Sequence, residues 1–153
     1  MRGDETQRRL VASILAAKGS QVHTIAPDAT AYEAIEGMVR SNVGSLIVSD
    51  GTTILGIFTE RDYLRRVTLQ DRDAKATRVR DVMTPHIICV DPSRTIGECM
   101  AMMTQERIRH LPVMERDRLV GIISIGDVVK YLSKEREVEI RHLTEYITGR
   151  PSE

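Results

Sequence analysis

The stretch Gly121-Ile122-Ile123-Ser124-Ile125-Gly126-Asp127 marks a corner where a strand passes into a helix. Residues 119–123 form a short, uncharged, β-branched run, which predicts a buried strand. Apolar residues then recur at helical spacing between 128 and 132, so Ser124 stands where the helix begins. A hydroxyl and a carboxylate three residues apart at this point are suited to the unpaired N–H groups of a helix start.

The same pattern occurs earlier in the chain, as Gly56-Ile57-Phe58-Thr59-Glu60-Arg61-Asp62. Residues 24–64 align with residues 89–129 without a gap, with nine identical pairs and a shared apolar pattern. Self-similarity of this kind indicates a structural repeat. Residues 59–62 are named corner one, and residues 124–127 are named corner two.

Each copy predicts the order strand, helix, strand, strand, helix. The first strands are expected over 22–25 and 87–90. The helices that follow open with the capping boxes Thr30-x-x-Glu33 and Thr95-x-x-Glu98. Hairpins are expected over 45–49 with 54–58, closed by a tight Asp50-Gly51 turn, and over 110–114 with 119–123. Methionines 100, 102 and 103 could suggest a metal or cofactor box, but their helical spacing favours the core.

These elements predict an α+β fold of two βαββα repeats with an additional helix at each end. We divide the chain into a helical lead-in (1–18), repeat one (19–70), a linker (71–84), repeat two (85–134) and a C-terminal helix (135–153). The end of the linker, Val79–Pro85, is expected to be docked. Residues 134–147 alternate charges around an apolar stripe that needs a partner.

Composition narrows the classes of function that the chain can have. The chain has 153 residues, 22 Lys and Arg against 22 Asp and Glu, and no net charge, which argues against a protein that coats nucleic acid. Cys89 and Cys99 lack metal-ligand spacing, so both are expected to be small buried hydrophobes in a reducing compartment. The sequence shows neither a signal-peptide core nor a membrane-spanning run, so a cytoplasmic location without membrane partners is expected.

Taken together, the tandem units, their corners and the segment Asp81-Val82-Met83-Thr84 resemble a tandem CBS-domain pair. The stretch Arg107–Val113 and the ending Glu145–Gly149 are similar to the small stand-alone members of that family. The resemblance covers about residues 19–149. It implies two repeats related by a pseudo-two-fold axis, with two clefts that commonly bind AMP, ADP, ATP, S-adenosylmethionine or NAD(H). It also implies that the bare pair dimerises into a disc of four domains.

The residues support the same chemistry. A carboxylate in the first turn of a helix can accept both hydroxyls of a ribose, and the hydroxyl and N–H groups beside it favour a phosphate oxygen. The entry strands, with residues 20–22 in repeat one and 84–87 in repeat two, are expected to supply an apolar slot and backbone groups for adenine. The residues assigned to a second cleft are Thr84, His86, Ile87, Arg107, Arg109, His110, Ser124 and Asp127. The residues assigned to a first cleft are Ser20, Gln21, Val22, Gly44, Ser45, Thr59, Arg61 and Asp62.

Alternatives stay open for each of these residues. The corner pairs also match an ordinary helix cap. Arg107 and Arg109 suit a phosphate, or are solvated surface charges. Arg61 reaches a phosphate or lies on the helix surface, and His110 is a ring-nitrogen donor or a satisfied histidine at the edge of the core.

The function expected from the sequence is a non-enzymatic regulatory module. It would bind a regulatory adenine nucleotide (AMP, ATP or NAD(H)), form a homodimer and change the state of an unidentified protein target. The mechanism would be a shift toward the conformation that binds ligand better. The alternative is a constitutive dimeric scaffold with vestigial clefts. A hydrolytic enzyme is a third reading, but the sequence contains no HExxH, Walker loop or GxGxxG, and its histidines are scattered.

Overall fold

The computed structural model describes residues 8–19 and 21–148. These residues form two compact units, each described here by itself. Residues 21–88 form the first-repeat unit, and residues 8–19 with 89–148 form the second-repeat unit. Both have the mixed α and β architecture expected from the sequence.

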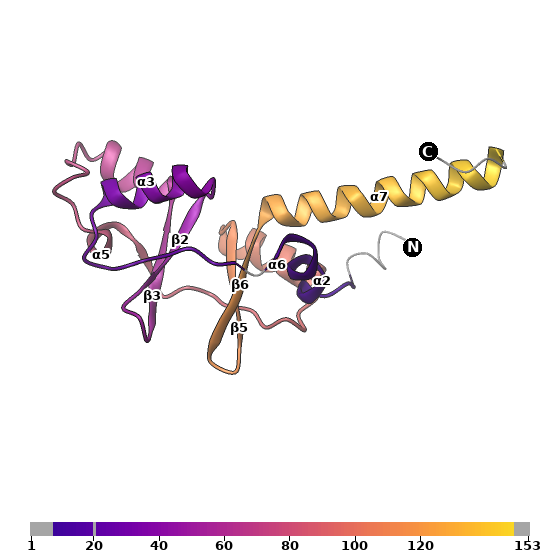
Figure 1. The fold of residues 1–153 in the computed structure, drawn as a ribbon, viewed down its shortest axis with the longest axis horizontal. Coiled ribbons are helices and arrows are strands. Elements are labelled where there is room, and N and C mark those ends of the chain that lie inside the picture. The colour runs from indigo at the N-terminus through magenta and orange to yellow at the C-terminus, as the bar shows by residue number, and fades with distance from the viewer. Residues whose placement is uncertain (1–7, 20, 149–153) are drawn as a thin grey trace. The chain divides into compact units, whose positions relative to one another are not determined.

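The first-repeat unit is built on a four-stranded sheet in the order β1-β2-β3-β4 (Figure 1). Strand β1 (Thr24–Ile25) is parallel to β2 (Ser45–Ser49), while β3 (Ile54–Thr59) is antiparallel to both β2 and β4 (Thr84–Pro85). Its helical segments are α3 (Ala31–Ser41), α4 (Glu60–Tyr63), the π-helix η1 (Leu64–Thr68) and α5 (Val79–Val82).

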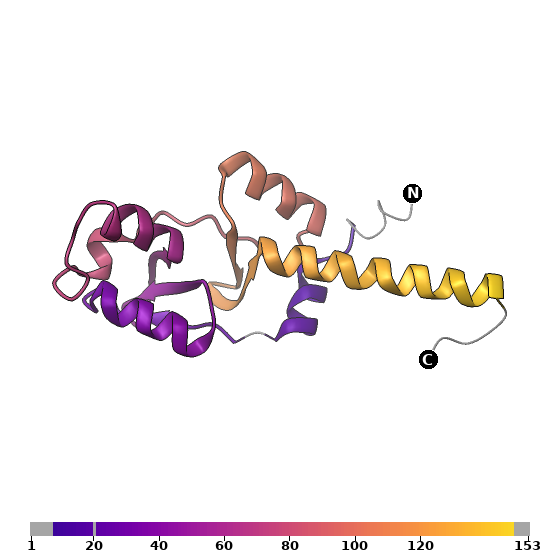
Figure 2. The same ribbon diagram turned by 90° about the horizontal axis from the view of Figure 1, so that it is seen from above.

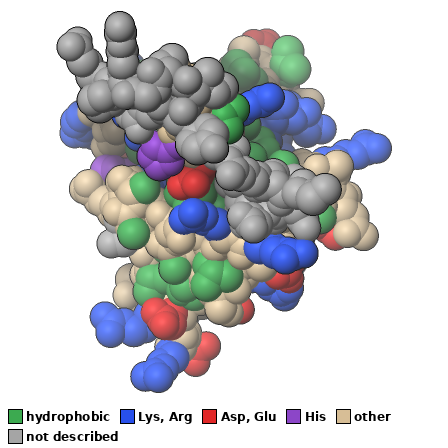
Figure 3. Space-filling model, turned by 90° about the vertical axis from the view of Figure 1, so that its right-hand side faces the viewer, with side chains coloured by type: hydrophobic (Ala, Val, Ile, Leu, Met, Phe, Trp, Pro, Cys, Tyr) green, Lys and Arg blue, Asp and Glu red, His purple; other side chains and the backbone are tan. Residues whose placement is uncertain are grey.

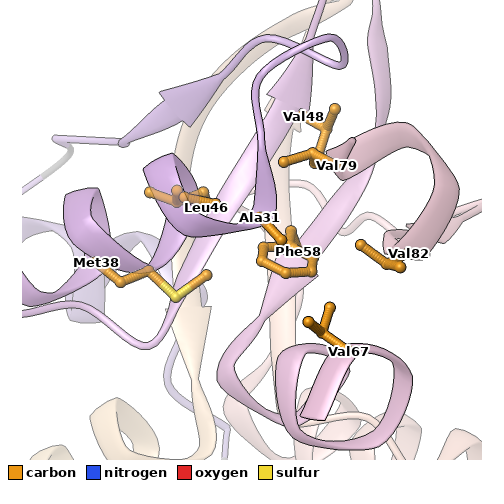
Figure 4. Close-up of a cluster of buried hydrophobic side chains, with 9 residues drawn as sticks. Ala31, Met38, Leu46, Val48, Phe58, Val67, Val79 and Val82 are labelled. Carbon is orange, nitrogen blue, oxygen red and sulfur yellow. The ribbon is translucent and has the colours of Figure 1, made fainter. Parts of the chain in front are cut away.

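A buried cluster joins these elements. Phe58 of β3 is fully buried, with Ala31 of α3, Val67 of η1 and Val79 and Val82 of α5 around it (Figure 4). Burying a large apolar side chain contributes about 1.5–3 kcal/mol. The segment 79–82 is therefore docked in the core, as its sequence indicated.

The second-repeat unit is built on the hairpin of β5 (His110–Glu115) and β6 (Arg118–Ser124). Its helices are α2 (Val11–Lys18), α6 (Ile96–Glu106) and α7 (Ile125–Thr148). Residues Val11, Ile14, Ile96, Cys99, Met103, Leu111, Val113, Ile123 and Val128 are buried and form its core. Helix α2 packs against β6 and α7.

Each repeat is completed by the segment that precedes the other repeat. In the second-repeat unit, Leu10 forms a bridge with Thr95, and the Val11 N–H donates to the Arg94 carbonyl at 2.8 Å. In the first-repeat unit, Arg78 forms the corresponding bridge with Thr30, and the Val79 N–H donates to the Ala29 carbonyl at 2.8 Å. The lead-in therefore packs on repeat two and the end of the linker packs on repeat one, which the order along the sequence does not reveal.

Three expected elements differ in the structure. The first strand of repeat two, expected over 87–90, is reduced to a single parallel bridge between Val90 and Val113. His86 lies just before it with φ 55°, a left-handed conformation that interrupts an extended chain. Strand β1, the first strand of repeat one, was expected over 22–25 and spans only Thr24–Ile25. The lead-in helix begins at Val11, with Val11 and Ile14 as its buried residues.

The C-terminal helix is not separate from repeat two. Helix α7 runs unbroken from Ile125 to Thr148 (Figures 1 and 2). The reason is that neither glycine nor proline interrupts the chain between residues 127 and 148. Beyond residue 132, the side chains of Val138, Ile140 and Leu143 are exposed.

Two smaller expectations also change. Residues 50–53 form a longer turn than a two-residue loop, because the Asp50 carboxylate accepts hydrogen bonds from the N–H groups of Thr52 and Thr53. Cys99 is buried as expected, and burial raises its pKa to about 11, whereas Cys89 is exposed. Across residues 8–19 and 21–148, none of the helices combines the length and apolarity needed to cross a membrane.

Candidate functional site

Corner two is a complete reciprocal cap. The Ser124 N–H donates to Asp127 Oδ2 at 2.8 Å, and the Asp127 N–H donates to Ser124 Oγ at 3.1 Å. These bonds satisfy two donors at the start of α7. The capping interpretation is thus correct as geometry, but an ionised carboxylate has about four acceptor sites and can serve a ligand as well.

Lys18 also reaches the same carboxylate. Its ammonium lies 2.6 Å from Asp127 Oδ2 and 2.8 Å from the carbonyl oxygen of Ile122. The side chains are 32% and 22% exposed, so the ion pair is only partly accessible to water. Burial pushes the pKa of Asp127 upward, but hydrogen bonds from Lys18 and Ser124 outweigh it and hold that pKa below its ordinary value.

Corner one has the same cap with a different neighbour. The Thr59 N–H donates to Asp62 Oδ2 at 3.0 Å, and the Asp62 N–H donates to Thr59 Oγ1 at 3.1 Å. Asp62 is 9% exposed, and its Oδ1 accepts the Thr84 hydroxyl at 2.9 Å. The carboxylate of corner one thus accepts a hydrogen bond from a neutral hydroxyl, whereas the carboxylate of corner two accepts one from an ammonium.

The hairpins bring further assigned residues to the corners. Strand register pairs Ser45 with Thr59 and His110 with Ser124. Just before these strands, the Gly44 carbonyl accepts the Glu60 N–H at 3.1 Å, and the Arg109 carbonyl accepts the Ile125 N–H at 2.9 Å. The structure therefore gathers one assigned set in each unit: Gly44, Ser45, Thr59 and Asp62 in the first, and Arg109, His110, Ser124 and Asp127 in the second.

Arg107 ends α6 in the left-handed conformation, with φ 55°. The aligned residue of repeat one, Asn42, ends α3 with φ 54°. Asparagine tolerates this conformation better than most residues, whereas arginine has no such preference. The side chains of Arg107 and Arg109 are exposed, as is that of Arg61 on α4.

Two glycines explain how the neighbouring segments reach the corners. A Cβ on Gly56 would lie 2.4 Å from the Thr84 carbonyl oxygen, and a Cβ on Gly121 would lie 2.6 Å from Leu15 Cδ2. Glycine therefore gives β4 room beside β3 and gives α2 room beside β6. Arg66 helps to hold the segment of β4 near β3, because its Nη1 donates to the Met83 carbonyl at 2.5 Å.

Three residues assigned to the second cleft lie in the first-repeat unit. The sequence assigned Thr84, His86 and Ile87 to the set of corner two, but they belong to the first-repeat unit, and Thr84 contacts Asp62 of corner one. The cause is the pairing of β4 with β3, at Gly56 with Pro85 and Ile57 with Thr84. Gln21 and Val22 lie in the same unit, before β1, and Ser20 lies outside the described residues.

Sequence reasoning missed Lys18 and Arg66. Lys18 ends α2, which packs against β6, and it meets Asp127 from a segment that lies far away in the sequence. The gapless alignment of the two repeats does not include Lys18, so no local pattern indicated its contact with corner two. No group of three or more His, Cys, Asp or Glu suited to a metal occurs in the described part of the chain.

The visible surface carries no dominant charge. Positive and negative side chains are interspersed with hydrophobic ones over the face in Figure 3. This distribution agrees with the zero net charge of the chain. Recognition of an anion would therefore depend on local groups such as those beside the corners.

Comparison with known proteins gives a consistent result. The CBS domain family model matches twice, at residues 15–69 and 79–134. The chain is 41% identical over 127 residues to the CBS domain-containing protein CBSX3, mitochondrial, of Arabidopsis thaliana, covering 80% of this chain and 62% of that protein. It is 35% identical over 117 residues to the CBS domain-containing protein YhcV of Bacillus subtilis, covering 76% and 83%. Its fold matches a solved CBS-domain protein from Burkholderia ambifaria with a TM-score of 0.78 at 49% identity, covering 80% and 92%.

Proposed function

Because this chain belongs to the CBS-domain family, with two CBS domains in tandem, we propose that it senses an adenine nucleotide. CBS-pair domains are generally regulatory and often bind adenine nucleotides. Each corner would then bind the ribose of one nucleotide. The nature of the preferred nucleotide is left to the binding experiment below.

The observation that carries this proposal is the pair of fixed carboxylates. Asp62 and Asp127 are each held at a helix start by a reciprocal cap, and neither depends on the ligand for its orientation. Such preorganisation lowers the entropy cost of binding. Ribose hydroxyls would donate to these carboxylates as charge-assisted hydrogen bonds.

The remaining assigned residues would recognise the rest of the nucleotide. In the second-repeat unit, the phosphate would lie near Arg107, Arg109 and His110, because arginine offers a forked donor that matches phosphate. In the first-repeat unit, Arg61 and the hairpin start at Gly44 and Ser45 would serve that end. Backbone groups of Gln21, Val22, Thr84, His86 and Ile87 are the proposed adenine contacts.

The output would be a conformational change in which the nucleotide stabilises one state of the chain. A ligand can shift an equilibrium only by its difference in affinity for the two states. The function needs no chemical change in the nucleotide, which should be recovered intact.

A constitutive scaffold is the second candidate, favoured by the exposed apolar side chains of α7. Val138, Ile140 and Leu143 are 45%, 58% and 53% exposed. An apolar face of this kind suits a second copy of the chain or another protein. Under this candidate the corners would be helix caps alone.

A thermal-shift panel separates the two candidates. AMP, ADP, ATP, NAD, NADH and S-adenosylmethionine would be tested on metal-free protein, with UMP as a control for the base. At about 100 times Kd, a ligand stabilises the folded state by roughly 2.7 kcal/mol. At roughly 2–4 °C per kcal/mol, that corresponds to a rise in Tm of about 5–11 °C. A flat response to all six at millimolar concentration would favour the scaffold.

A further inference from the structure

Lys18 forms an ion pair with the carboxylate of Asp127, which the proposed function assigns to ribose binding. Its ammonium is 2.6 Å from Asp127 Oδ2, and it also donates to the carbonyl of Ile122 on β6 at 2.8 Å. The Ser124 N–H donates to that same oxygen, Oδ2. A ribose hydroxyl seeking this oxygen would meet a cation already bound there.

The start of the helix that carries Lys18 is anchored independently of corner two. Near the start of α2, the Val11 N–H donates to the Arg94 carbonyl at 2.8 Å and the Ala12 N–H to the Pro92 carbonyl at 3.1 Å. Val11 and Ile14 are buried, whereas the two residues before Lys18, Ala16 and Ala17, are exposed. Leu15 lies against Gly121 of β6, and the contact of Lys18 with Asp127 is a second attachment of the C-terminal turn in a helix whose start is fixed independently.

Corner one has a different contact at its carboxylate. Its Asp62 is met by the neutral Thr84 hydroxyl, and β4, which carries Thr84, is itself paired with β3. If a ribose hydroxyl replaced the Thr84 hydroxyl at Asp62, no charge would move and the pairing of β4 with β3 would remain. If a ribose hydroxyl replaced Lys18 at Asp127, it would release an ammonium and the end of helix α2.

We propose that Lys18 is a latch that competes with ribose for Oδ2 of Asp127, so that a nucleotide at corner two that uses this oxygen displaces the ammonium. The inference rests on the proposed function and adds to it a regulatory consequence. Displacement frees the end of α2, three residues before Gln21, where the first-repeat unit begins. Binding at corner two is thereby coupled to the chain segment that leads into the other unit.

The test uses adenosine, whose ribose is the same but which has no phosphate to attract Lys18 directly. In K18M the competitor is lost, and adenosine should bind about fivefold tighter, which corresponds to about 1 kcal/mol. K130M is the matched control, because Lys130 is an exposed lysine on α7 three residues after Asp127. K130M removes the same charge from the same unit and should leave adenosine affinity within twofold of wild type.

Hydrogen exchange of α2 gives an independent readout. In the wild type, adenosine should speed exchange at the C-terminal turn of α2. In K18M that turn should exchange faster without ligand and respond no further.

Weaker or unchanged adenosine binding in K18M would overturn the latch while leaving nucleotide binding intact. Tighter binding together with the exchange pattern supports it. If the wild-type chain bound neither adenosine nor any nucleotide, the proposed function itself would fall, and the latch with it.

Discussion

Asp127 serves two purposes at the residue scale. It closes the cap of α7 by accepting the Ser124 N–H, and it pairs with the Lys18 ammonium. Both interactions need the ionised carboxylate, because a protonated carboxyl neither attracts a cation nor accepts as strongly. The cap could be read from the spacing of Ser124 and Asp127, but Lys18 could not, since it lies far from Asp127 along the chain.

The protonation of Asp127 should therefore be visible in stability. Its folded-state pKa lies below the ordinary value of 3.8, so the ionised form stabilises the fold above that pH and the contribution is lost as pH falls through the folded pKa. Urea unfolding of wild type and Asp127→Asn should differ at neutral pH, and the difference should shrink below about pH 4. A difference that stayed constant or grew on acidification would contradict this assignment.

At the scale of elements, the two glycines decide how closely other segments approach the corner strands. Neither Gly56 nor Gly121 has a left-handed backbone, so the requirement is space. At Gly56 the neighbour is a backbone oxygen of β4, while at Gly121 it is the end of the flexible Leu15 side chain. Backbone atoms cannot rotate away, whereas a leucine methyl can.

The substitutions Gly56→Ala and Gly121→Ala should accordingly differ in cost. Overpacking costs about 1–3 kcal/mol, and we expect Gly56→Ala at the upper end and Gly121→Ala at or below the lower end. The free energy of unfolding from urea titrations measures both. Adding Leu15→Ala to Gly121→Ala should relieve the crowding, and a larger cost for Gly121→Ala than for Gly56→Ala would show that the crowding argument is wrong.

Sequence patterns predicted most elements and failed at identifiable places. The hairpins and the helices after Thr30 and Thr95 follow from alternation, capping boxes and apolar spacing, which are local signals. The strand expected over 87–90 is reduced to one bridge at Val90, after the left-handed His86, and no composition rule indicates this. The prediction of a separate C-terminal helix is wrong, because the change in charge pattern near residue 134 does not end α7, which continues to Thr148.

At the scale of the whole molecule, packing does not follow sequence order. The lead-in completes repeat two, and the end of the linker completes repeat one. The corners were predictable from the repeat alone, because each lies within one βαββα copy. Their neighbours Lys18 and Thr84 were not, because long-range packing decides which segment meets which corner.

The central claim is that the corner carboxylates bind ribose, and calorimetry of AMP on Asp127→Ala tests it most directly. Asp127→Ala removes up to two charge-assisted bonds of about 1.5–3 kcal/mol each, so affinity at corner two should fall about a hundredfold or more. Asp62→Ala should affect the other site, with a smaller loss expected because repeat one lacks the arginine pair.

Glu98→Ala is the control, because Glu98 closes an equivalent capping box at the start of α6. It should cost a similar cap energy, about 1 kcal/mol, and leave AMP affinity unchanged. The account predicts a loss of binding in Asp127→Ala that Glu98→Ala does not share. Unchanged AMP affinity in Asp127→Ala would contradict it and reduce corner two to a helix cap.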